Sequence, residues 1–391
     1  MSSYRMRVRD FEDTLSQDLI DIKKLRKLCF NGIPDEQGFR ALCWKILLNY
    51  LPPDQTIWSE TLIKTRKLYA QYIEELIVTP GSGDDHPLSV NPDSQWQTFF
   101  KDNEVLLQID KDVRRLCPEI SFFQQAAEYP CLAVVTSGGR KRLHRRVTHS
   151  TLSSANVQRR GLGVTKQIAL VVRKAAEDYA PLEEGREAHW EVVERLLFLY
   201  AKMNPGQGYV QGMNEIIGPI YYTFATDLVL ANREHAEADC FFVFTNLMGE
   251  IRDFFIKSLD ETESGINRMM SKLNQTTKQK DLEVWEKLCS IELHPQYYSF
   301  RWLTLLLSQE FALPDVLRIW DSLFADEARF SFLNHICCAM ILLVREDILA
   351  GDFPSIVKLL QHYPTSVDIP AVISKAAELA DRDMHGFLLQ R

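Results

Sequence analysis

Apolar residues recur at three- and four-residue steps along most of this 391-residue chain, which is the spacing of one face of an α-helix. The first such stretch runs over residues 11–28 and is followed by Asn31 and Gly32, a pair typical of a helix end. No stretch has the alternating pattern and β-branched residues of a strand. The sequence therefore predicts an all-α fold, with further helices over residues 44–51, 62–77, 190–203, 240–255, 282–289, 298–311, 314–324, 330–344, 353–360 and 369–380.

The apolar runs are short. The longest one, residues 336–344, has nine residues, whereas a helix needs about 20 to cross a bilayer. The first residues lack the apolar stretch of a signal peptide, Ser2 stands where myristoylation needs glycine, and the last residues include no prenylation cysteine. We expect a cytoplasmic protein that is recruited to membranes only transiently.

Eight cysteines are spread along the chain without a CxxC pair, and most of them lie in apolar runs. Cys337 and Cys338 follow His335, but neighbouring thiols on one helix point apart and no second ligand pair is present. We therefore expect reduced core thiols and no metal site.

One segment of the chain is strongly basic. Between Glu128 and Glu177 there are ten lysines and arginines and no acidic residue, although the whole chain carries a net charge of −8. Because residues 136–163 are also rich in Ser, Thr and Gly, we predict a mobile basic insertion there. The segment between Tyr129 and Tyr179 has no other Phe, Tyr or Trp for stacking on bases, which argues against nucleic acid as a partner. A solvated loop and a peripheral contact with anionic membrane both stay open.

Motifs of self-contained catalytic sites are missing. The chain has no HExxH, no GxSxG and no GxxxxGKS/T phosphate loop, so it does not resemble a hydrolase or a nucleotide-binding enzyme in its own right. Two local patterns remain as candidates for chemistry.

The first pattern is a helical turn whose apolar face includes Ile109. Asp110 and Arg114 are four positions apart and Asp112 and Arg115 three, so either acid can hold an arginine on the exposed face near the helix end. One interpretation is a set of surface ion pairs worth about 0.3–0.5 kcal/mol each. Local reasoning does not separate the two arginines.

The second pattern is residues 204–215, where one proline and three glycines between two apolar helices predict a tight connection. This connection presents Gln211 at a fixed place. A glutamine so placed can orient a water molecule, although it is a poor base, and it can equally cap a backbone group of the turn.

Written as motifs, the two patterns are Ile109-x-x-Asp112-x-x-Arg115 and Tyr209-x-Gln211. Together they resemble the paired finger motifs of the TBC-domain Rab GTPase-activating proteins. Three flanking blocks are also similar to that family, and the resemblance extends over about residues 32–344. These blocks are Gly32-Ile33-Pro34 with Phe39, Arg40 and Trp44; Asn204-Pro205 with Met213-Asn214; and Pro295-Gln296-Tyr297 with Arg301-Trp302-Leu303, Glu310-Phe311 and residues 317–321.

The resemblance implies a two-lobed helical fold with an N-terminal helix in residues 1–31, a TBC domain in 32–344 and C-terminal helices in 345–391 packed on the second lobe. It also implies a function, the activation of a GTP-bound Rab-family small GTPase in vesicle and membrane trafficking, with no stand-alone reaction. Arg115 would neutralise the charge that develops on the transferring phosphoryl group, and Gln211 would position the attacking water. GTP and Mg²⁺ would arrive with the partner, so the chain needs no cofactor of its own.

The resemblance implies supporting residues around both fingers. Asp112 would fix the rotamer of the finger arginine, and Ile109 would seat its helix. Tyr209 would brace the glutamine connection, and Gly208 and Gly212 would let the backbone approach the partner closely.

Two features depart from the family pattern. Leu116 stands where Thr or Ser is common, and the two fingers are separated by more positions than usual, largely because of the basic insertion. A catalytically silent Rab-binding scaffold and a membrane-associated adaptor therefore stay open as alternatives. We predict core positions for Trp44, Trp302 and Trp320, and structural ion pairs for the charged residues of the flanking blocks.

Overall fold

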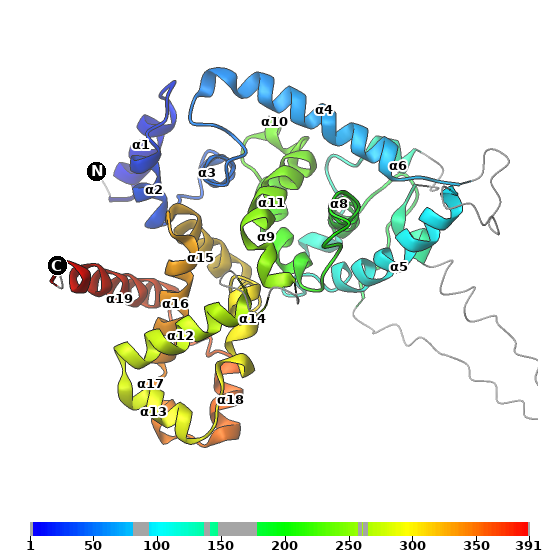
Figure 1. Ribbon diagram of the computed structural model, residues 1–391. Coiled ribbons are helices and arrows are strands. Elements are labelled where there is room, and N and C mark those ends of the chain that lie inside the picture. Colours follow the sequence, from blue (N-terminus) through cyan, green and yellow to red (C-terminus); the bar gives the residue numbers. More distant parts are fainter. Residues whose placement is uncertain are drawn as a thin grey trace, which may run out of the picture. The chain divides into compact units, whose positions relative to one another are not determined.

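The computed structural model describes residues 3–80, 94–136, 141–147, 178–256, 260 and 265–389, which contain helices and no strand (Figure 1). The predicted all-α fold is confirmed. Two isolated β-bridges occur, Leu19 with Asp54 and Ala126 with Ala188. Within these residues, none of the helices combines the length and the apolar character that a membrane span requires.

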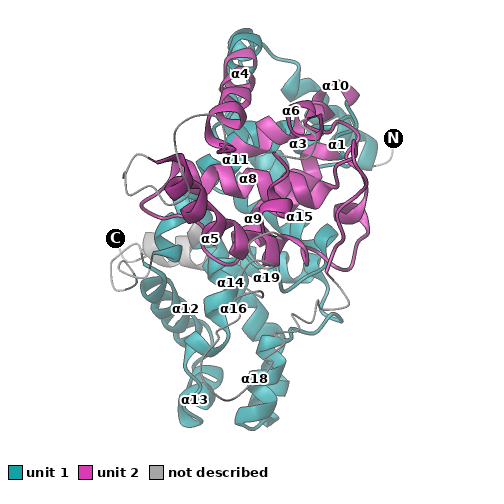
Figure 2. Ribbon diagram, turned by 90° about the vertical axis from the view of Figure 1, so that its right-hand side faces the viewer, with its two compact units in different colours: residues 1–62, 226–229, 242–391 teal, residues 63–225, 230–241 magenta. Residues whose placement is uncertain are grey.

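The chain divides into two compact units, which Figure 2 shows in different colours. Unit 1 comprises residues 1–62, 226–229 and 242–391, and unit 2 comprises residues 63–225 and 230–241. Two helices, α4 (Trp58–Leu76) and α11 (Ala236–Ile251), begin in one unit and end in the other.

Unit 1 is organised around α16 (Arg329–Leu343), which packs against α19 (Ile369–Leu389), α12 (Ile266–Lys280) and α15 (Leu313–Ala325). Residues 336–341 of α16 are completely buried, as expected for a helix that is apolar on all sides. The other helices of unit 1 are α1 (Ser3–Leu15), α2 (Ile22–Phe30), α3 (Phe39–Leu47), η1 (Gln55–Ile57), η3 (Arg252–Phe255), α13 (Leu282–Ser290), η5 (Pro295–Tyr297), α14 (Ser299–Thr304), α17 (Arg345–Ala350) and α18 (Phe353–Gln361).

A buried carboxylate ties the N-terminal and C-terminal parts of unit 1 together. Asp321 on α15 accepts hydrogen bonds from Trp44 Nε1 at 2.9 Å, from the Ile33 backbone N–H at 3.0 Å and from Arg40 Nε at 3.2 Å. Burial raises the pKa of Asp321, and these donors oppose the rise. Trp44, Trp302 and Trp320 are fully buried, so the predicted core positions are confirmed.

Two predicted helices of unit 1 are shorter than expected. The helix expected over residues 11–28 is broken between α1 and α2, because Asp21 caps a new helix by accepting the Lys24 N–H at 3.1 Å. Leu19, which the periodicity placed on the buried face, is 71% exposed. The helix expected over residues 298–311 ends after α14, because Leu306 and Leu307 adopt left-handed backbone angles (φ 50° and 65°).

Unit 2 is organised around α8 (His189–Met203), in which every residue from 189 to 201 is buried. This helix packs against α5 (Gln95–Val113) and α9 (Met213–Ala225). The remaining helices are η2 (Phe122–Gln124), α6 (Leu132–Val135) and α10 (Leu230–Arg233), and residues 143–147 form a further helical turn.

Residues 141–147, which belong to the predicted basic insertion, are part of the core of unit 2. Arg142 is 3% exposed and donates from Nη2 to both carboxylate oxygens of Glu191 on α8, at 2.8 and 2.9 Å. Arg146 donates to Asn103 Oδ1 at 2.9 Å, and its guanidinium lies 4.1 Å from the ring centre of Phe99. For Arg142 and Arg146 the prediction of a mobile insertion is wrong, since both side chains are buried and bound to acceptors of α8 and α5. Residues 137–140 and 148–163 of the insertion lie outside the described part of the chain.

Candidate functional site

Arg115 lies in the turn that ends α5, residues 113–117, which we call the arginine turn. The apolar face of α5 anchors this turn, because Leu106, Ile109 and Val113 are fully buried where α5 packs on α8 and α9. The regular helix ends at Val113, and the next backbone hydrogen bonds are shorter-range, from Arg115 N–H to Asp112 O at 3.2 Å and from Leu116 N–H to Val113 O at 3.3 Å.

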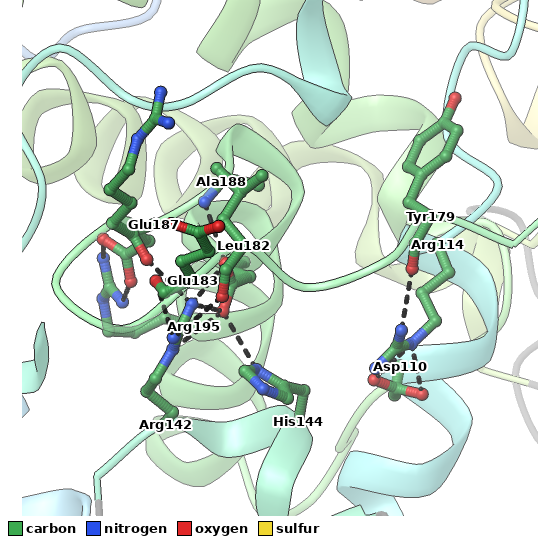
Figure 3. Close-up of polar contacts among 12 residues, drawn as sticks. Asp110, Arg114, Arg142, His144, Tyr179, Leu182, Glu183, Glu187, Ala188 and Arg195 are labelled. Atoms are coloured by element: carbon green, nitrogen blue, oxygen red, sulfur yellow. Dashed lines mark hydrogen bonds and ion pairs between the residues drawn. The ribbon is translucent and has the colours of Figure 1, made fainter. Parts of the chain in front are cut away.

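Arg114 is held inside unit 2. Its Nε donates to both carboxylate oxygens of Asp110 at 2.8 and 2.9 Å, and its Nη1 donates to the Tyr179 carbonyl at 2.8 Å (Figure 3). Its guanidinium also lies 4.5 Å from the Trp190 ring centre. Glu194 lies beside this pair, and its complete burial and the Asp110 charge raise its pKa well above the usual range. The expectation that Asp110 and Arg114 pair on the exposed face is wrong, since the residues are 7% and 8% exposed.

Arg115 points to solvent. Its side chain is 56% exposed, its Nε donates to the Lys111 carbonyl at 3.0 Å, and Asp178 Oδ1 lies 3.9 Å away. Two consecutive residues at the helix end therefore differ. Arg114 is fixed in the core, and Arg115 can extend outward to a partner.

Asp112 connects the two sequence motifs. Its Oδ2 accepts a hydrogen bond of 2.7 Å from the hydroxyl of Tyr209, which is 97 positions away in the chain. Burial and the Asp112 charge raise the pKa of the Tyr209 phenol far above the physiological range, so the phenol remains a donor. Among the described residues the expected ion pair between Asp112 and Arg115 is not formed, since Asp112 Oδ2 accepts from Tyr209 and Arg115 lies beside Asp178.

Gln211 lies in a second turn, residues 204–212, which we call the glutamine turn. Its shape depends on local contacts, since Gly208 N–H donates to Asn204 O at 2.7 Å and Tyr200 Oη donates to Gln207 Oε1 at 2.9 Å. Gly208 and Gly212 have φ values of 67° and 100°, a region that favours glycine.

The side chain of Gln211 is exposed, and within the described residues it forms no hydrogen bond with a backbone group of the turn. In the described structure, Gln211 therefore does not cap the turn. Like Arg115, the glutamine faces outward from a restrained backbone.

Leu116 is a packing residue. It is fully buried, and a Cβ atom built on Gly218 of α9 would lie only 3.0 Å from Leu116 Cδ1. The leucine that departs from the family pattern thus fills the space that a glycine leaves in the neighbouring helix.

Several residues that shape the arginine turn had no sequence signal. Tyr179 and Trp190 contact Arg114 from positions far along the chain, and Glu194 is a buried acid on α8. Only the buried position of Glu194 in the apolar period of α8 gave any indication of an internal polar contact.

A separate cleft of about 380 Å³ lies within unit 2, between α4, α11 and the segment that precedes α6. Two of its lining side chains are already engaged, since Arg66 binds Asp239 at 2.9 and 3.0 Å and Tyr69 Oη donates to Glu237 at 2.6 Å. Neither Arg115 nor Gln211 lines it. Within the described residues, no group of three or more His, Cys, Asp or Glu side chains could hold a metal ion.

The arrangement of helices defines a known class of domain. The crystal structure of the Ypt/Rab-GAP domain of Gyp1p superposes on this chain with a TM-score of 0.67 and 21% sequence identity, covering 97% of this chain and 98% of that one. The fold is therefore that of a TBC domain.

Sequence comparison agrees with the fold. Residues 154–349 match the Rab-GTPase-TBC domain family. Human TBC1 domain family member 13 is 54% identical over 397 aligned residues, which cover 97% of this chain and 99% of that protein. A TBC domain-containing protein of Schizosaccharomyces pombe is 36% identical and covers 96% of this chain and 73% of its own length. The chain belongs to the Rab-GTPase-TBC domain family, as the finger motifs and flanking blocks predicted.

Proposed function

We propose that this chain is a GTPase-activating protein for a Rab-family small GTPase in its GTP-bound state, acting in vesicle and membrane trafficking. The observation that carries the proposal is the Tyr209–Asp112 hydrogen bond of 2.7 Å, which joins the glutamine turn to the end of α5. Each of these two restrained turns presents one exposed polar side chain, Arg115 and Gln211.

Arg115 acts on the transferring phosphoryl group. A Rab GTPase hydrolyses GTP slowly because negative charge develops on the phosphoryl oxygens and the attacking water is poorly held. The guanidinium of Arg115 gives up its contacts with the Lys111 carbonyl and with Asp178 and binds the phosphoryl oxygens instead, while the α5 backbone stays in place. A planar guanidinium with several fixed donors matches phosphoryl oxygens better than the point charge of a lysine.

Gln211 positions the attacking water. An amide both donates and accepts hydrogen bonds, which suits it to hold a water without taking its proton. The rigid glutamine turn reduces the entropy that must be lost to place the amide, and Gly208 has no atom within 4 Å of where a Cβ would lie, so it leaves room for a partner.

The partner supplies GTP and Mg²⁺, and the chain contributes side chains but performs no stand-alone reaction. Contact with an anionic membrane belongs to the same proposal, as transient recruitment from the cytoplasm to the membrane that carries the Rab. Arg142 and Arg146 take no part in this contact, since both are buried. It depends on basic residues elsewhere in the chain.

The test is phosphate release from a panel of GTP-loaded Rab proteins. Wild type, Arg115→Ala and Gln211→Ala are compared with two matched controls, Arg186→Ala and Gln108→Ala, which remove the same side chains from exposed positions of unit 2. We expect acceleration by wild type and by both controls, and loss of acceleration in the two finger variants.

Two other results would overturn parts of the proposal. Binding to a GTP-loaded Rab without acceleration by wild type would favour the silent scaffold. Equal loss of rate in a finger variant and its control would mean that the substitutions act through binding or stability, so that the fingers have no special role.

A further inference from the structure

Tyr179 forms three hydrogen bonds with the arginine turn from more than sixty positions away. Its backbone N–H donates to the Arg114 carbonyl at 3.0 Å, and its own carbonyl accepts from Arg114 Nη1 at 2.8 Å. Its hydroxyl donates to the Leu116 carbonyl at 2.8 Å across 63 positions. The residue is 4% exposed. These hydrogen bonds lie on both sides of Arg115, and none of them involves Arg115 itself.

The carbonyls that Tyr179 binds are the ones a helix end leaves without partners. After the last residue of a helix, carbonyl groups have no following N–H to accept from and need another donor. The backbone N–H of Tyr179 satisfies the Arg114 carbonyl, and its phenol satisfies the Leu116 carbonyl. Together they fix the backbone immediately before and after the finger arginine.

The backbone adopts a left-handed conformation directly after these contacts. Cys117 has a φ of 45°, which is costly for a residue with a side chain, and Pro118 follows it. A backbone held in such a conformation needs contacts from outside the turn. The phenol of Tyr179 supplies one of them at all physiological pH values, since burial raises its pKa to about 12.

We propose that Tyr179 is a positioning residue for Arg115, which sets the direction in which the finger leaves the helix end. This inference rests on the proposed GTPase-activating function and assigns a residue outside both finger motifs to it. Displacing a catalytic group by about 1 Å can cost on the order of 10²-fold in rate, so a backbone clamp beside the finger acts on the chemical step.

The test uses the full chain and a Rab that the panel identifies as a substrate. Tyr179→Phe removes only the hydroxyl, and Tyr129→Phe, at a residue that is 41% exposed, is the matched control. We expect Tyr179→Phe to lower kcat about tenfold with KM unchanged, because the lost contact orders the finger rather than the docking surface. Tyr129→Phe should retain the wild-type kcat.

A second measurement reports the clamp without any GTPase. Cys117 is half-buried beside Tyr179, whereas Cys289 is exposed and serves as an internal standard. Alkylation by N-ethylmaleimide, mapped by mass spectrometry well below the unfolding transition, should be faster at Cys117 in Tyr179→Phe than in wild type. Arg115→Ala should leave the Cys117 rate unchanged.

The outcomes separate the two proposals. If wild type accelerates no Rab, the proposed function fails and the role of Tyr179 in it fails as well. If wild type is active and Tyr179→Phe keeps its kcat, only the positioning role is overturned. Unchanged alkylation at Cys117 would also overturn the positioning role, because the hydroxyl would then restrain nothing in the turn. A rise in KM parallel to the fall in kcat would overturn it as well, because a general loss of structure would then explain the slower rate.

Discussion

The arginine turn and the glutamine turn restrain their outward-facing side chains by different means. The glutamine turn is built from its own sequence, with Gly208 and Gly212 at positive φ and hydrogen bonds that span four to seven positions. The arginine turn depends on residues far along the chain, above all Tyr179 and Trp190. A turn built locally tolerates changes elsewhere in the fold, whereas one built from distant contacts is sensitive to any of them. Among the described residues, the Tyr209–Asp112 hydrogen bond joins the glutamine turn to the end of α5, directly before the arginine turn.

The largest effect on activity should come from replacing Arg115, and the same replacement at Arg114 shows how the two neighbouring arginines differ. Arg115→Ala should reduce the stimulated hydrolysis rate by about 10³–10⁵-fold, as for other arginine fingers. It should change the free energy of unfolding by less than about 0.5 kcal/mol, since the side chain is 56% exposed.

Arg114→Ala should, in contrast, strongly lower the free energy of unfolding. Removing one partner of a buried ion pair costs about 3–5 kcal/mol, which urea denaturation would measure. If Arg115→Ala destabilised the protein as much as Arg114→Ala, the division between a structural and a catalytic arginine would be wrong.

The division between a structural and a catalytic arginine shows how far the sequence alone could predict the site. The apolar period of α5 placed Ile109 inside, but the side of the helix end on which each arginine lies depends on where α8 and the segment from Tyr179 pack. Those contacts join residues tens of positions apart, and a single sequence gives no signal for them. The break between α1 and α2 has a local cause, the Asp21 cap, which the apolar period concealed.

The glutamine turn was predictable because its causes are local. One proline and three glycines within residues 204–212 require a tight connection whatever surrounds them. The basic segment shows the opposite case, since its composition predicted a mobile insertion, whereas Glu191 on α8 holds Arg142 in the core. Composition describes a segment alone, and the buried acceptor is visible only in the fold.

Gln211→Ala should give the second-largest effect. We expect a loss on the order of 10²-fold in kcat, because an unplaced water reacts from a wider range of positions. Stability should be unchanged, since the side chain is exposed and makes no hydrogen bond within the described residues. Single-turnover hydrolysis and thermal unfolding would check both. A large fall in the unfolding temperature would mean that Gln211 supports the turn, contrary to its local construction.

Breaking the contact that couples the two turns should have an intermediate effect. Tyr209→Phe removes the hydrogen bond to the Asp112 carboxylate, and hydrogen bonds to charged groups contribute about 1.5–3 kcal/mol. We expect about this loss in the free energy of unfolding, together with about a tenfold fall in kcat as the turns become independent.

A double-mutant cycle with Asp112→Asn gives the coupling energy directly. The two single variants and the double variant should lose nearly the same activity, because either substitution removes the same contact. Additive losses would show that Asp112 acts on Arg115 independently of Tyr209, as the family resemblance first implied.

The smallest effect should come from Asp178, the acid whose Oδ1 lies 3.9 Å from Arg115 Nε. With side chains 56% and 27% exposed, the pair is worth about 0.2–1 kcal/mol, and Arg115 must give it up to reach a phosphoryl group. Asp178→Asn should therefore raise kcat/KM by roughly 1.5- to 5-fold at low salt. Glu184→Gln, which neutralises an exposed acid nearby, is the matched control and should have no such effect. Because about 1 M salt shortens the screening length to roughly 3 Å, the ratio of variant to wild type should approach one there. A slower Asp178→Asn at low salt would mean that the acid directs the arginine toward the partner, and the restraint on the arginine turn would then be part of its catalytic alignment.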